Sequence, residues 1–70
     1  MTSPIEIRLN GDLYDTPAGA TVADLVRQLG LPEDQVAIEL DRHIVRRAQW
    51  AATRLEPGAA VEVVRLVGGG

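Results

Sequence analysis

The sequence contains no cysteine, no lysine and no phenylalanine, and it has a single histidine, His43. Without cysteine it has no disulfide, no thiolate ligand for a metal and no thiol nucleophile. Without lysine it has no side-chain amine for a Schiff base or an isopeptide bond. One histidine by itself does not build a multi-histidine metal site. The chain is therefore poorly equipped as an enzyme, and we expect it not to be one.

Positive charge is also scarce, with seven basic residues against ten acidic ones and a net charge of −3. This balance argues against a nucleic-acid-binding protein. No apolar run approaches the ~20 residues of a membrane span. Residues 1–8 lack the basic start and apolar stretch of a signal peptide. At seventy residues we expect one soluble, cytoplasmic domain that binds neither nucleic acid nor a membrane.

The N-terminal part has the pattern of a β-hairpin. Apolar and charged residues alternate over 5–9, as they do in a half-buried strand. Asn10-Gly11 follows, a dipeptide typical of the two-residue turn that requires positive φ at both positions. A returning strand is predicted over 12–16, with Leu13 as its core-facing residue.

A short helix is predicted next. Thr21 is a good N-cap, and Asp24 three residues later completes a capping box. Gly30 is suited to the left-handed position that ends a helix, and Pro32 prevents continuation. Between these signals the apolar residues fall at helical spacing and form one face: Val22, Leu25, Val26 and Leu29.

Three further strands are predicted over 36–40, 43–46 and 61–67. Residues 47–55 fit either a helical turn or an irregular wrap, with Trp50 as a core plug between the fourth strand and the helix. A single helix with one apolar face needs one sheet to cover it. The sequence therefore predicts a two-layer α+β domain.

The chain ends in three glycines, Gly68, Gly69 and Gly70. We expect a folded domain over 1–67 and a flexible tail over 68–70, because glycine loses the most backbone freedom on ordering. An extended tail of three residues reaches about 10 Å, enough to place its carboxylate in a partner's active site. From the tail alone, an inert end and a reactive arm remain equally good interpretations.

Several segments together resemble the ubiquitin-like β-grasp family, and within it the ThiS family of sulfur carriers. The Trp50 region and the glycine tail are the specific parts of the resemblance, while the hairpin and helix fit any β-grasp protein. The resemblance covers nearly the whole chain and rests on Asn10-Gly11-Asp12, on Thr21–Val26 with Leu29, on Ile44–Trp50 and on Val67–Gly70. It implies one mixed sheet of four to five strands packed on one main helix.

The resemblance also implies a reaction cycle centred on Gly70. An adenylating enzyme uses ATP to activate the Gly70 carboxylate, while Gly68 and Gly69 enter that partner's active site. A persulfide donor then supplies sulfur, and the resulting thiocarboxylate gives it to thiazole synthase for the thiazole ring of thiamine. The chain itself is expected to bind no metal and no cofactor, since ATP belongs to the partner.

Two residues of the last strand are predicted to dock partners. If Val61 and Val63 face the helix, Val64 and Leu66 lie on the open face of the sheet beside Glu6, Arg8 and Glu39. An apolar patch rimmed by charge is a common partner surface.

Other functions remain open from the sequence. The small subunit of molybdopterin synthase resembles this chain in fold and tail. A ubiquitin-like modifier conjugated through Gly70 and a plain interaction domain with an inert tail are further alternatives.

Overall fold

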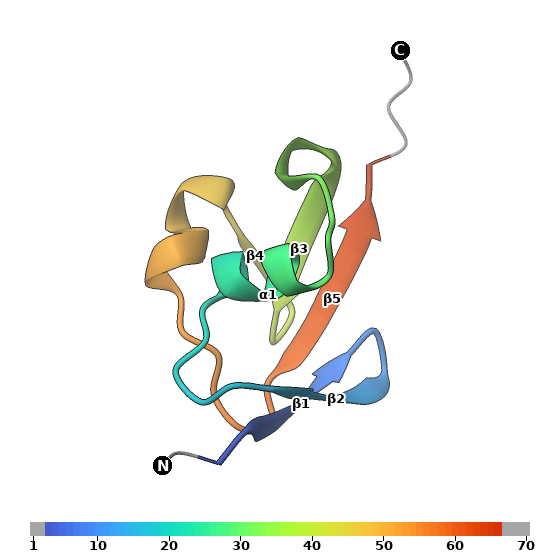
Figure 1. The fold of residues 1–70 in the computed structure, drawn as a ribbon. Helices are drawn as coiled ribbons and strands as arrows, with labels where there is room; N and C mark the ends of the chain where they lie inside the picture. Colours follow the sequence, from blue (N-terminus) through green and yellow to red (C-terminus); the bar gives the residue numbers. More distant parts are fainter. Residues whose placement is uncertain (1–2, 67–70) are drawn as a thin grey trace.

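The computed structural model describes residues 3–66 (Figure 1). In this part of the chain, one α-helix, two short 3-10 helices and five strands follow one another. Their bounds are β1 Ile5–Leu9, β2 Asp12–Thr16, α1 Val22–Gln28, η1 Glu33–Gln35, β3 Val36–Leu40, β4 His43–Val45, η2 Arg47–Ala52 and β5 Ala60–Arg65. Within residues 3–66, no helix has the length and apolar character needed to cross a membrane.

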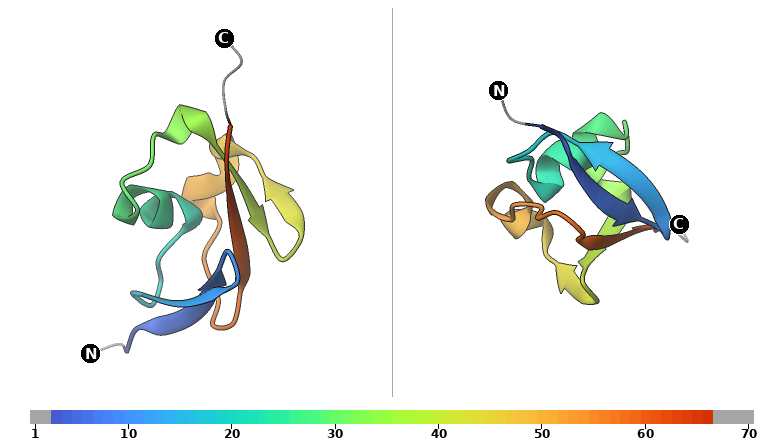
Figure 2. Two further views of the ribbon diagram at one scale, coloured as in Figure 1. Left: turned by 90° about the vertical axis from the view of Figure 1, so that its right-hand side faces the viewer. Right: turned by 90° about the horizontal axis from the view of Figure 1, so that it is seen from below.

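The five strands form one mixed sheet in the order β2-β1-β5-β3-β4. β5 runs parallel to β1 and antiparallel to β3, and the two outer pairs are antiparallel hairpins. α1 covers one side of this sheet, as the turned view shows (Figure 2, left). The predicted two-layer α+β architecture is confirmed, and β5, the last strand in the sequence, lies in the middle of the sheet.

The ends of α1 are held by the residues predicted to hold them. The Thr21 hydroxyl accepts a hydrogen bond from the Asp24 backbone N–H at 3.2 Å, and Asp24 Oδ2 accepts from the Thr21 N–H at 3.0 Å. At the other end the Gly30 N–H donates to Arg27 and the Leu31 N–H donates to Val26. This pair of bonds, with φ of +68° at Gly30, is the Schellman ending.

The β1–β2 hairpin corrects one prediction. Asn10 and Gly11 form the two-residue turn, with φ of +51° and +87°. This turn pairs Leu9 with Asp12 and therefore Arg8 with Leu13. Because Arg8 faces solvent, Leu13 faces solvent too and is 60% exposed. The prediction that Leu13 faces the core was wrong.

Residues 47–55 were ambiguous in sequence. They contain η2 and then run alongside the start of α1, to which they are hydrogen-bonded. The Val22 N–H donates to Thr53 O and the Leu55 N–H donates to Ala20 O. Trp50 is buried, and its Nε1–H donates to Val45 O at 2.9 Å. The predicted plug between β4 and the helix is confirmed.

The core lies between the sheet and the helical layer. The apolar face of α1 contributes three buried residues, Val22, Leu25 and Val26, with Leu29 packed at the margin. Strands β1, β3 and β5 supply Ile7, Val36, Ile38 and Val61, and the core is completed by Ala20, Trp50, Leu55 and Ala59. Thr16 is the buried polar residue, and its hydroxyl donates to Gln28 Oε1 at 3.2 Å.

The β3–β4 turn carries two residues that are not glycine in the left-handed region. Asp41 has φ of +49° and Arg42 has φ of +72°. Asp41 is held there by two bonds to Ala60: its N–H donates to Ala60 O at 2.7 Å, and its Oδ1 accepts from the Ala60 N–H at 2.9 Å. Arg42 has no such compensation among the described hydrogen bonds.

We expect Arg42→Gly to stabilise the domain by about 0.5–1 kcal/mol. Relief of left-handed strain, about 1–2 kcal/mol, exceeds the extra entropy that glycine loses on folding. Arg46→Gly is the matched control, because Arg46 is exposed and has an ordinary φ of −64°. The control is expected to lower stability by about 0.5 kcal/mol, since only the entropy effect remains. Urea denaturation of both variants measures the difference, and equal shifts would contradict the strain at Arg42.

Candidate functional site

The predicted reactive residues Gly68, Gly69 and Gly70 lie outside the described residues, as do Val67 and the predicted domain boundary. The structure does show how the chain is held just before them. β5 pairs with β3 over five of its six residues, from Val61 opposite Leu40 to Arg65 opposite Val36. The Leu66 N–H then donates to Gln35 O at 2.8 Å. The chain is therefore anchored in the middle of the sheet up to residue 66.

Val64 and Leu66 lie on the side of the sheet away from α1. Val61 is buried and Val63 packs against the core, while Val64 is 49% and Leu66 is 52% exposed. On β3 the residue directly opposite Val64 is Ala37. The predicted exposure of both candidate docking residues is confirmed, and they border the point where the chain leaves the described fold.

Two more large apolar side chains on this open face were missed in the sequence. Ile44 on β4 is 74% exposed and stands opposite Glu39, whereas Leu13 lies at the other edge, on β2. The hairpin register was the available signal for Leu13, because a two-residue turn at Asn10-Gly11 already places it opposite Arg8. Nothing local distinguishes Ile44 from Val45, since only the pairing of β3 with β4 decides which faces outward.

Charged residues border the apolar part of the open face on the side of the β3–β4 turn. Glu39 and Glu62 are direct partners on neighbouring strands. Together with Arg8 and Arg42 they line a shallow hollow of about 320 Å³. Glu6 and Arg8 were also predicted beside Val64. Glu6 pairs with Asp15 at the far end of β1, and Arg8 pairs with Ala60, four residues before Val64, so both lie away from it.

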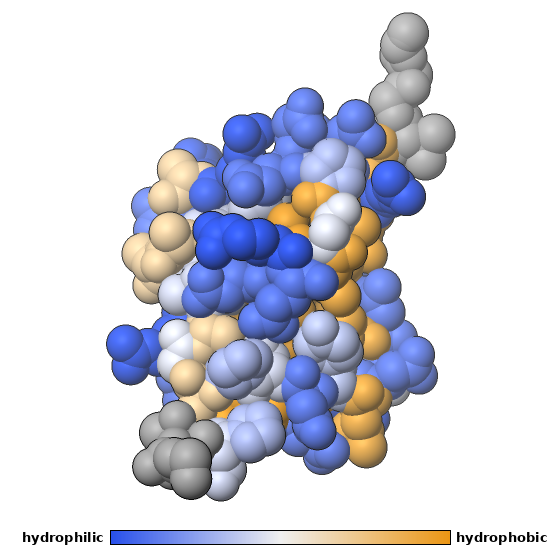
Figure 3. All heavy atoms as spheres, in the orientation of Figure 1, coloured by the Kyte–Doolittle hydropathy of each residue, from blue (hydrophilic) through white to orange (hydrophobic). Residues whose placement is uncertain are grey.

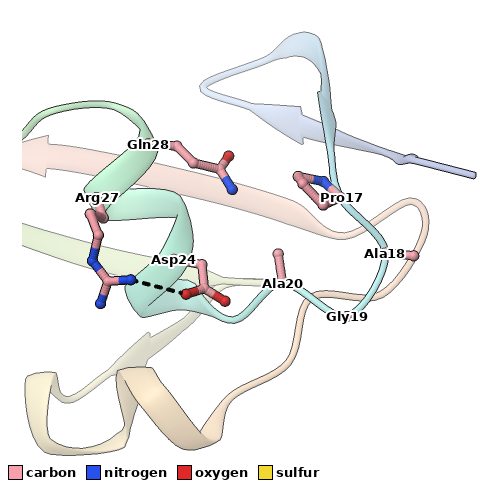
Figure 4. A pocket seen from close by; sticks show the side chains of 7 residues that line it. All are labelled: Pro17, Ala18, Gly19, Ala20, Asp24, Arg27 and Gln28. Atoms are coloured by element: carbon pink, nitrogen blue, oxygen red, sulfur yellow. Dashed lines mark hydrogen bonds and ion pairs between the residues drawn. The ribbon is translucent and has the colours of Figure 1, made fainter. Parts of the chain in front are cut away.

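A larger hollow, about 380 Å³, lies at the start of α1 (Figure 4). Its polar side chains already serve the fold. Arg27 donates to Asp24 Oδ1 at 3.4 Å, and Gln28 accepts from the Thr16 hydroxyl. The Thr21 backbone N–H lowers the pKa of Asp24 below its ordinary value, with the Thr21 hydroxyl and Arg27 acting in the same direction. The polar groups of this hollow are therefore used to cap and hold α1.

No group of three or more metal-ligating side chains is brought together within residues 3–66. His43, at the start of the edge strand β4, is exposed. The candidate site is therefore the partly apolar open face of the sheet, at the end of β5 that leads toward the C-terminus.

Comparison with known proteins agrees with this arrangement. Residues 7–70 match the family model described as "ThiS family".

The chain belongs to the ThiS family.

The match includes the terminal glycines, and the resemblance stated from the sequence is thereby confirmed.

Solved structures confirm the fold of this ThiS-family chain. A crystal structure of the thiamine biosynthesis protein ThiS from Geobacter metallireducens superposes with a TM-score of 0.81 at 26% identity. The superposition covers 94% of this chain and 100% of that one. The predicted ubiquitin-like β-grasp fold is confirmed.

The curated proteins similar to this chain include one of about the same length and one that is much longer. The sulfur carrier protein ThiS of Escherichia coli is 29% identical over 66 residues, which cover 94% of this chain and 100% of that protein. A thiazole synthase of Magnetococcus marinus is 35% identical over 66 residues, again 94% of this chain. This ThiS-family chain spans only 20% of the length of that synthase.

Proposed function

We propose that this ThiS-family chain is a sulfur carrier of thiamine biosynthesis and that it holds its sulfur as a thiocarboxylate on Gly70. The observation that carries the proposal is the family match, which runs through residue 70 and so includes the terminal glycines. The E. coli relative, matched over its whole length, is named a sulfur carrier protein. A carrier without cysteine must hold sulfur elsewhere than on a thiol, and a C-terminal carboxylate is one such place.

The chemistry requires activation, because a carboxylate is a poor electrophile. In the proposed cycle the Gly70 carboxylate attacks the α-phosphate of ATP on an adenylating enzyme, pyrophosphate leaves, and an acyl-adenylate forms. A persulfide sulfur then attacks the Gly70 carbonyl carbon and AMP leaves. Thiol reduction of the resulting acyl disulfide releases the thiocarboxylate. In this cycle the chain is a protein substrate, and ATP is bound by the partner.

Thiazole synthase is the proposed acceptor of the sulfur. One curated relative with that name contains a segment 35% identical to this chain. A carrier-like segment within a thiazole synthase chain supports a functional link between the two.

Intact mass spectrometry tests the proposal directly. The chain is incubated with ATP, an adenylating enzyme of the ThiS pathway and a persulfide donor. The expected result is replacement of one oxygen by one sulfur at Gly70, located by fragmentation. An AMP adduct that does not go on to gain sulfur would favour a protein modifier instead. No adduct with an enzyme shown to be active on another carrier would overturn the proposal.

Val64→Asp is expected to slow adenylation by about tenfold or more while leaving the domain folded. Val64 is half-exposed, so a charge there is tolerated in the free protein, but it places an unpaired carboxylate in the proposed docking face. Leu66→Asp is expected to act in the same way. Leu13→Asp is the matched control, because Leu13 is an exposed apolar residue of the same face at the far edge strand. The adenylation rate of each variant is measured. Equal rates in Val64→Asp and Leu13→Asp would show that Val64 is not part of the docking surface.

A further inference from the structure

β1 covers only the first two of the six residues of β5. Arg8 pairs with Ala60 and Leu9 pairs with Val61. At Asn10 the chain then turns back into β2, so β1 ends while β5 continues. Among residues 3–66, no strand therefore lies on the β1 side of this central strand beyond Val61.

The side chain of Asn10 hydrogen-bonds to the next part of this edge, at Val63. Its backbone N–H donates to Val61 O at 2.9 Å. Its Oδ1 accepts from the Val63 N–H at 2.7 Å, and its Nδ2 donates to Val63 O at 3.4 Å. One amide side chain thus replaces the missing strand at Val63, and the edge opens immediately after it.

The backbone N–H and C=O of Arg65 point toward this open edge. The Asp41 N–H donates to Ala60 O and the Leu66 N–H donates to Gln35 O. Hydrogen-bonded pairs alternate in an antiparallel ladder, so the even-numbered residues of β5 bond to β3. Arg65 stands opposite Val36 in a pair that exchanges no hydrogen bonds. Within residues 3–66, no residue forms a hydrogen bond with the Arg65 N–H or C=O.

An apolar groove of about 320 Å³ lies beside this edge, on the helix side of the sheet. Apolar side chains gather between α1 and β5 on the face shown in Figure 3. The groove is lined by Leu9, Leu29, Leu31, Val36 and Val63, with Arg65 at its rim. A strand placed next to β5 would direct alternate side chains into this groove, because side chains alternate between the two faces of a sheet.

We propose that the free edge of β5 at Arg65 binds an extended segment of thiazole synthase, which adds to the sheet in line with β1. One apolar side chain of that segment fills the groove. This inference rests on the proposed function. The mode is strand addition, in which main-chain hydrogen bonds supply affinity and a side-chain pocket supplies specificity.

The edge lies near the reacting end of the chain, and the occupant is inferred from a thiazole synthase that contains a segment similar to this chain. Arg65 lies five residues before Gly70, a distance of at most about 17 Å when extended. A protein that takes sulfur from Gly70 therefore lies against this end of the domain. The presence of a related segment within a thiazole synthase chain is consistent with such contact.

Amide hydrogen exchange of the unmodified chain tests the proposal. In the free domain, the Arg65 amide is expected to exchange rapidly, whereas the Leu66 amide is protected by its bond to Gln35 O. Addition of thiazole synthase is expected to slow exchange at Arg65 by about tenfold or more. An Arg65 amide that is equally exposed with and without the synthase, under conditions where the complex forms, would overturn the proposal.

Arg65→Pro supplies the corresponding variant. It removes the N–H that no residue in 3–66 uses, and proline is tolerated on strand edges. Binding to thiazole synthase is expected to weaken by about tenfold. Arg65→Ala keeps the N–H and is expected to bind within about threefold of the parent chain. Equal losses in the two variants would assign the effect to the side chain and overturn the edge contact.

Thiocarboxylate formation is measured on the same variants, because it is independent of the synthase. We expect Arg65→Pro to gain sulfur on Gly70 like the parent chain. Loss of synthase binding with normal sulfur loading supports the edge proposal. Normal synthase binding with normal loading overturns the edge proposal alone, whereas a parent chain that never gains sulfur overturns the proposed function.

Discussion

Deletion of Gly69 and Gly70 is expected to abolish the sulfur-dependent mass shift completely and to leave the domain folded. The deletion withdraws the C-terminal carboxylate by two residues, about 7 Å. Reactions in enzyme sites lose about 100-fold for a misplacement of only 1 Å. The buried core ends at Val61 and the described β-pairing ends at Arg65, so neither depends on the deleted residues. Intact mass after incubation with ATP, the adenylating enzyme and a persulfide donor measures the loss.

A chain of full length with a C-terminal carboxamide is the matched control. It keeps all three glycines and changes only the reacting group, so it separates tail length from carboxylate chemistry. We expect it to gain neither AMP nor sulfur. Sulfur loading of either chain would show that a group other than the Gly70 carboxylate carries the sulfur. Retained binding of both chains to the partner, without loading, is the result that the docking surface predicts.

Trp50→Ala is expected to destabilise the domain by about 3–5 kcal/mol, enough to unfold most of it. Trp50 is 3% exposed in the core beside α1, and the substitution leaves a large cavity there. It also removes the Nε1–H donor of Val45 O. A domain of this size gains rarely more than about 3–5 kcal/mol from its core, so it has no margin for such a loss. Circular dichroism and urea denaturation measure the outcome.

Trp50→Phe separates the two contributions. Phenylalanine retains most of the buried apolar surface but lacks the N–H, so the expected cost is about 1–3 kcal/mol and the variant stays folded. A Trp50→Ala variant as stable as the parent chain would show that η2 does not complete the core. Equal destabilisation by both substitutions would instead assign the whole effect to the hydrogen bond with Val45.

The elements predicted best are those whose signals are local. The Thr21 and Asp24 capping pair and the Gly30 ending are set within a few residues, and each forms the bonds predicted for it. Alternation over 5–9 and 36–40 identified core strands, because one face of each is buried by the single helix. Residues 47–55 stayed ambiguous, because η2 is held by the start of α1 and by Val45 and has no strong helix signal of its own.

The candidate site divides in the same way. The exposure of Val64 and Leu66 followed from simple alternation over residues 61–66, whereas Leu13 was assigned to the wrong face. Its neighbour Tyr14 is the half-buried residue packed against the core. In a strand with few apolar residues, alternation does not identify the buried face, and the pairing with β1 decides it.

The sequence by itself determined the caps, the hairpin turn, the apolar faces of α1, β1 and β3, the absence of a thiol and the identity of the terminal residues. Each depends on residue type or on contacts a few positions apart. Only the tertiary structure decided that Ile44 faces outward and that the β1 side of β5 is open at Arg65. Those features depend on where β1 stops beside a strand that lies about fifty residues later, from Arg8 to Ala60. Long-range register arises from the packing of the whole sheet on α1, so no local pattern contains it.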